Sequence, residues 1–157
     1  MVESKPGEGS TFHVYLPRTD EAEEIAETGT EEPTPTGSER ILFVDDEPML
    51  LDMVGQMLGR LGYEVVTANG SFEAMELFRK DPDRFDLVIA DMTMPKMTGI
   101  ELAGELLNTR PNIPIILCSG SIDQNLKEKA TAAGIREFLA KPISITTIAQ
   151  IVRKALD

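Results

Sequence analysis

Two stretches decide the fold: Ile41–Asp46, which reads ILFVDD, and Leu87–Asp91, which reads LVIAD. Each is a run of four apolar residues, followed by two aspartates in the first stretch and by one in the second. Short apolar runs without alternation are typical of strands buried on both faces of a parallel sheet. The carboxyl ends of such strands meet at one edge of the sheet, so both stretches bring acidic side chains to the same edge.

The rest of the chain alternates between the period of a strand and the period of a helix. Pro48 lies where the first turn of a helix accepts proline, and Gly62 is placed to end that helix. Further strands are expected at residues 63–67, 113–118 and 137–140, and helices at 48–61, 71–80, 98–108, 124–133 and 145–156. Five strand–helix pairs predict an α/β fold, a doubly wound five-stranded parallel sheet with helices on both faces.

Composition and charge exclude several classes of protein. The chain has 157 residues, 41% of them hydrophobic and only one of them cysteine, Cys118. A single cysteine excludes an internal disulfide framework and a cysteine-rich metal site, and we interpret Cys118 as a core residue. No apolar run is long enough to span a bilayer and no signal-peptide pattern occurs, so we expect a cytoplasmic protein. The net charge of −12 argues against nucleic-acid binding.

Residues 20–39 carry eight acids, no bases, two prolines and two glycines. Such a segment buries too little apolar surface to offset the entropy of ordering. We interpret it as an acidic linker that precedes the α/β domain at residues 40–157.

Five side chains at the predicted strand ends form a candidate site. Asp45 and Asp46 follow the first strand, Asp91 ends the third, and Ser119 and Lys141 follow the fourth and fifth. Ligand sites of open α/β sheets lie at this edge. Three converging carboxylates repel one another unless a cation lies among them, and oxygen ligands without histidine or cysteine suit Mg²⁺ or Mn²⁺.

Magnesium usually shares its coordination sphere with phosphate oxygens, so the site favours phosphoryl chemistry. An aspartate that attacks phosphorus forms an acyl phosphate. A lysine ammonium and a serine hydroxyl then stabilise the phosphoryl oxygens.

These residues, together with the stretch DMTMPKMTG at Asp91–Gly99, resemble the receiver domain of two-component response regulators over residues 41–157. The resemblance implies a flavodoxin-like fold with strand order 2-1-3-4-5. It implies that Asp91 is phosphorylated by a phosphohistidine of a histidine kinase or a histidine phosphotransfer protein. Asp46, Asp91 and the Thr93 carbonyl would bind Mg²⁺ directly, and Asp45 through water.

The same resemblance implies a conformational switch. Ser119 and Lys141 would hold the phosphoryl oxygens, and the Lys141–Pro142 bond would be cis. Phosphorylation would draw the Ser119 hydroxyl toward Asp91, shift residues 120–123 and change the exposure of Phe138. Phe138 could equally be a plain core residue. The domain would be a monomer or weak dimer.

Residues 6–17 contain a glycine pair followed by an alternating strand pattern and a proline. They resemble the last glycine-rich motif and final strand of the ATP-binding domain of sensor histidine kinases. Residues 1–19 would then be the remnant of that domain in a hybrid kinase. The full-length kinase could be anchored in a membrane, but the given residues predict no direct membrane contact. The remnant lacks the machinery of a kinase, and we expect it to be disordered or to add to an exposed sheet edge.

Two other functions compete with the phosphoacceptor interpretation. The chain could be a receiver-like interaction module that works without phosphorylation. It could also be an aspartyl-phosphate phosphatase, but those enzymes need a second aspartate two residues after the nucleophile. Thr93 occupies that position, so the machinery for turnover is missing. The receiver would catalyse only its own phosphotransfer and dephosphorylation.

Overall fold

The computed structural model describes residues 2–5, 7, 9–15, 34–135 and 137–157. The chain divides into two compact units, residues 1–31 and 32–157. In the first, β1 (Val2–Lys5) pairs with β2 (Gly9–Phe12) in an antiparallel hairpin whose side chains are all exposed. A strand after the glycine pair was predicted, whereas its partner β1 was not. The expectation that this strand would be disordered is therefore wrong, whereas its addition to the edge of a sheet in its own or a neighbouring molecule stays a prediction.

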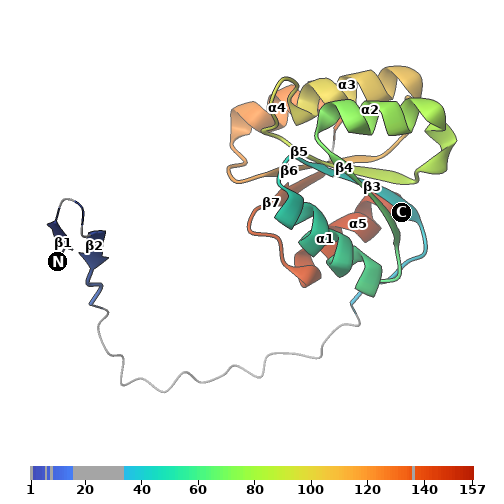
Figure 1. Ribbon diagram of the computed structural model, residues 1–157. Coiled ribbons are helices and arrows are strands. Elements are labelled where there is room, and N and C mark those ends of the chain that lie inside the picture. The colour runs from blue at the N-terminus through green and yellow to red at the C-terminus, as the bar shows by residue number, and fades with distance from the viewer. Residues whose placement is uncertain (1, 6, 8, 16–33, 136) are drawn as a thin grey trace. The chain divides into compact units, whose positions relative to one another are not determined.

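The larger unit has the predicted alternation of strands and helices (Figure 1). Its strands are β3 (Arg40–Asp45), β4 (Glu64–Asn69), β5 (Leu87–Asp91), β6 (Ile115–Ser119) and β7 (Glu137–Ala140). Its helices are α1 (Pro48–Arg60), α2 (Ser71–Lys80), α3 (Gly99–Thr109), α4 (Gln124–Ala132) and α5 (Ile145–Leu156), with a short 3₁₀ turn, η1 (Pro82–Arg84).

All five strands are parallel and follow the order β4-β3-β5-β6-β7, which is the predicted order 2-1-3-4-5 counted from β3. Helices α2, α3 and α4 cover one face, and α1 and α5 cover the other (Figure 1). The predicted fold class is therefore confirmed.

Alternate residues of each central strand enter two separate cores, because successive side chains of a strand point to opposite faces. Leu42 and Val44 of β3 pack with α2 and α3, whereas Ile41 and Phe43 pack with α1 and α5. All four are at most 1% exposed. Residues 41–44 are all apolar because helices cover both faces of the strand, as the sequence predicted.

Strand boundaries differ from prediction at β6, which begins at Ile115 and not at residue 113. The Ile113 N–H donates to the Arg110 carbonyl at 3.2 Å. Pro114 has no N–H to donate to a neighbouring strand. These two residues therefore complete the turn after α3. The bonding between β6 and β5 begins at the Pro114 carbonyl, which accepts a hydrogen bond of 3.0 Å from the Val88 N–H.

The start of α3 lies unusually close to the end of β5. Thr98 caps the helix through a capping box with Glu101. The hydrogen bonds that Thr98 donates to the Glu101 carboxylate lower the pKa of Glu101. A Cβ on Gly99 would collide with the Asp91 carbonyl oxygen and the Leu117 side chain. Only glycine permits this approach, which brings the first turn of α3 against the backbone of Asp91.

Gly99→Ala should therefore destabilise the fold by about 1–3 kcal/mol through overpacking. The measurement is urea unfolding at equilibrium. Gly104→Ala is the matched control, because Gly104 lies in the same helix with no atom near its missing Cβ. Helix propensity predicts that this second change is neutral or stabilising by up to about 1 kcal/mol. Equal stabilities for the two variants would contradict the close approach.

Cys118 is fully buried in the core between the sheet and helices α1 and α5, which confirms its interpretation as a core residue. Burial raises the pKa of its thiol to about 12. We expect no reaction with a thiol-specific disulfide reagent at pH 8 in the native protein, and complete reaction after unfolding in urea. Rapid labelling of native protein would contradict this placement.

Candidate functional site

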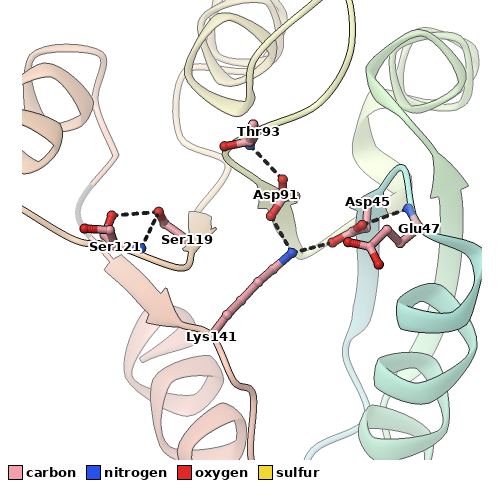
Figure 2. A network of polar contacts seen from close by, with 7 residues as sticks. All are labelled: Asp45, Glu47, Asp91, Thr93, Ser119, Ser121 and Lys141. Carbon is pink, nitrogen blue, oxygen red and sulfur yellow. Dashed lines mark hydrogen bonds and ion pairs between the residues drawn. The ribbon is translucent and has the colours of Figure 1, made fainter. Parts of the chain in front are cut away.

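The carboxylate of Asp45 is completely buried at the carboxyl end of β3. Its Oδ1 accepts a hydrogen bond of 2.9 Å from the backbone N–H of Glu47, at the start of α1 (Figure 2). A buried carboxylate is costly unless it is hydrogen-bonded and paired with a positive charge. This bond supplies the first of those two requirements.

Asp91 lies beside Asp45 because β3 and β5 are neighbours in the sheet, in the register Val44 to Ala90. Only 6% of Asp91 is exposed. Its Oδ2 accepts a hydrogen bond of 2.7 Å from the N–H of Thr93, two residues further along the loop. The backbone of the loop after β5 therefore orients the carboxylate.

Lys141, which follows β7, supplies the positive charge for both acids. Its Nζ lies 3.0 Å from Asp45 Oδ2 and 2.6 Å from Asp91 Oδ1, so the ammonium bridges the two carboxylates (Figure 2). Burial by itself lowers the pKa of Lys141, but the hydrogen bonds to Asp91 and Asp45 outweigh it and the net shift is upward. One ammonium faces two carboxylates, so a further cation at this edge would be stabilised.

Ser119 ends β6 and is 8% exposed. Its hydroxyl donates to the Ser121 carbonyl at 2.8 Å and accepts from the Ser121 N–H at 3.3 Å. These contacts direct the hydroxyl toward its own loop (Figure 2). Ser119 thus lies at the strand end where it was predicted, and its hydroxyl is hydrogen-bonded to the backbone of Ser121.

The predicted metal ligands share this edge without forming a ready cluster. Within the described residues, no group of three or more His, Cys, Asp or Glu side chains is arranged to hold a metal ion. Asp46 is half-buried and, with Lys96, lines a cavity of about 270 Å³ whose lining includes neither Asp45 nor Asp91. Asp45 and Asp91 nevertheless provide oxygen donors of the kind that Mg²⁺ and Mn²⁺ prefer.

The peptide bond between Lys141 and Pro142 is cis, as predicted. Phe138, on β7, is half-buried and packs against the core cluster beneath α2 and α3. This packing fits a core residue, although Phe138 is not completely buried. Its role as a switch stays a prediction.

Three partners of the site were not predicted: the N–H groups of Glu47 and Thr93 and the carbonyl of Ser121. Each acts through its backbone, and every non-proline residue carries the same backbone groups. No residue type in the sequence could therefore have indicated them.

The chain was compared with known proteins. Residues 41–153 match the response regulator receiver domain family. The transcriptional regulatory protein GlrR of Escherichia coli is 35% identical over 119 residues, 74% of this chain and 26% of GlrR. The aerobic respiration control sensor protein ArcB of Escherichia coli is 28% identical across 99% of this chain and 20% of ArcB. The chain thus spans about a quarter or less of these curated relatives.

Solved structures agree with these matches. The chemotaxis protein CheY4 of Vibrio cholerae has a TM-score of 0.73 and 30% identity, with 76% of this chain and 100% of CheY4 covered. A receiver domain of a sensor histidine kinase from Pseudomonas aeruginosa shares the fold, with a TM-score of 0.68, 24% identity and coverage of 76% of this chain and 98% of that one. That structure is described with a magnesium ion in its active-site cleft. By sequence and fold together, the chain belongs to the response regulator receiver domain family of two-component signalling.

Proposed function

We propose that Asp91 accepts a phosphoryl group from a phosphohistidine of a histidine kinase or a histidine phosphotransfer protein. The observation that carries the proposal is the bridge formed by Lys141 between the buried carboxylates of Asp45 and Asp91. Packing gives no reason to place two acids at adjacent strand ends, because each costs free energy to bury. A site for phosphoryl transfer explains the placement, because it needs a nucleophilic carboxylate and further acidic groups beside it.

The chain's own residues divide the work of transfer. A carboxylate oxygen of Asp91 forms a bond to phosphorus as the phosphorus–nitrogen bond to the donor histidine breaks and the nitrogen keeps the electron pair. The N–H of Thr93 holds the carboxylate in position. The ammonium of Lys141 is placed to exchange its contact with Asp91 for one with a phosphoryl oxygen.

Mg²⁺, when bound, would neutralise charge on the phosphoryl oxygens. Asp46, Asp91 and the carbonyl of Thr93 would hold the ion directly, and Asp45 would do so through water. This all-oxygen donor set fits Mg²⁺ or Mn²⁺. Ser119 would exchange the Ser121 carbonyl for a phosphoryl oxygen, and that exchange would move residues 120–123 and alter the surface around Phe138.

Incubation with acetyl phosphate and Mg²⁺ should add the mass of one phosphoryl group to the native chain. Asp91→Asn should abolish the addition. The matched control is Asp52→Asn, because Asp52 is an exposed acid that accepts a bond only from its helix neighbour Gln56 among the described hydrogen bonds. Intact-mass measurement reports all three. An unmodified native chain would instead favour an interaction module that works without phosphate.

Lys141→Ala should lower the initial rate of phosphorylation by roughly 100-fold, the typical effect of removing one donor to a charged transition state. Lys154→Ala is the control, since Lys154 pairs with Glu137 on an exposed surface. Chelation of divalent cations should stop the reaction in every variant. A rate for Lys141→Ala within twofold of native would exclude the assigned role of the lysine.

We further propose that the chain is part of a hybrid sensor kinase, with residues 1–19 from its ATP-binding domain and residues 20–39 as a linker. Support comes from ArcB, which aligns across 99% of this chain, residues before the receiver included. The genomic sequence upstream of residue 1 should then encode the rest of that domain. A different upstream coding sequence would contradict the proposal.

No helix in the described residues is long and apolar enough to cross a membrane. We propose a cytoplasmic location and a monomer or weak dimer. The acidic net charge of −12 supports a protein partner and not a nucleic acid.

A further inference from the structure

We infer that Ser71 is a positioning residue for Asp91: it clamps the loop that follows β5 and so holds the Thr93 N–H on the carboxylate. The inference rests on the proposed phosphorylation of Asp91. Ser71 is uncharged and is not among the proposed magnesium ligands. The described contacts of Lys141 are with Asp45 and Asp91 and do not include Ser71.

Ser71 is the first residue of α2 and is 2% exposed. Its hydroxyl donates to the carbonyl of Met97 at 2.7 Å, across 26 residues of sequence, and lies 3.9 Å from the sulfur of Met94. A serine at the start of a helix commonly faces solvent or caps its own helix. Here the hydroxyl is buried and joins α2 to Met97, two residues before α3 begins at Gly99.

A second contact lies beside the first. Lys96 has a φ of 69°, a left-handed conformation that is strained for a residue other than glycine. Its ammonium lies 5.9 Å from the centre of the Phe72 ring. Consecutive residues of α2, Ser71 and Phe72, thus contact consecutive residues of the loop. Backbone strain persists only where surrounding structure enforces it, and such sites cluster at functional positions.

The loop is otherwise held by backbone hydrogen bonds at its ends and by Met94, whose side chain is buried in the core between them. At one end, the Met92 N–H donates to the Cys118 carbonyl at 2.8 Å. At the other, the Gly99 N–H donates to the Met92 carbonyl at 3.0 Å. Thr93 and its bond to Asp91 Oδ2 lie between these anchors. Removing the Ser71 hydroxyl leaves only the packing of Met94 to hold the loop between its ends, so the Thr93 N–H is kept less firmly on the carboxylate. The rate of a group-transfer reaction is sensitive to a displacement of the reacting groups by about 1 Å.

The first arm of the test needs neither metal nor donor. Amide hydrogen exchange is followed by NMR in the full chain, native and Ser71→Ala. Exchange at Thr93 and Met97 should rise about fivefold, the factor expected for one lost hydrogen bond. Exchange at Ile89, in the centre of β5, should not change. Unchanged exchange at Thr93 overturns the inference.

The second arm measures phosphorylation by acetyl phosphate and Mg²⁺, at a temperature where circular dichroism shows every variant folded. Ser71→Ala should react about fivefold more slowly than the native chain. Ser71→Thr keeps the hydroxyl and should recover most of the rate. Phe72→Ala should have a smaller effect than Ser71→Ala, because an exposed cation–π contact is weak. Thr109→Ala is the control, since its hydroxyl also donates to a backbone carbonyl, that of Glu105, but far along α3.

A native rate for Ser71→Ala overturns the positioning role, whatever the exchange at Thr93. So does an equal loss in Thr109→Ala, which would indicate a general effect on stability. If the native chain takes up no phosphate at all, the proposed function fails, and the exchange arm still decides whether Ser71 holds the loop.

Discussion

The ammonium of Lys141 between two buried carboxylates is the interaction on which the site depends. Asp45 and Asp91 are almost entirely removed from solvent, and each contacts the same Nζ at 3.0 Å or less. Removing one partner of a buried ion pair leaves an uncompensated charge, which is strongly destabilising. The three groups lie at the carboxyl ends of three different strands, so the pairs exist only if the strands keep their order and register.

The parallel sheet meets this requirement in a simple way. β3 and β5 are adjacent, and Asp45 and Asp91 are the last residues of those strands. Gly99 then lets α3 begin directly against the backbone of Asp91. The site is therefore made of strand ends and of the loops that leave them, supported by two packed cores on which the strands rest.

The chain enters the sheet at the opposite edge. Gly37 donates to the Leu61 carbonyl at 3.0 Å, and Glu39 pairs with Arg153 of α5 at 2.7 Å. This hydrogen bond from Arg153 lowers the pKa of Glu39. β3 begins immediately afterwards at Arg40 and reaches the site at Asp45, and its six residues span about 20 Å. Residues 34–39 thus dock at the edge away from Asp91 and leave the rim of the site clear.

The sequence by itself determined the fold class, the burial of the central strands on both faces and the five side chains at the strand ends. The period of the hydrophobic residues and the positions of the acidic residues are local properties of the chain. The cis bond before Pro142 also followed from a resemblance visible in the sequence. Only the tertiary structure decided which groups touch. It placed Asp46 and Lys96 on one cavity, turned the Ser119 hydroxyl toward Ser121, and set Ser71 against the loop after Asp91. Such contacts join residues far apart in the chain or use backbone groups common to all residues, so no local pattern encodes them.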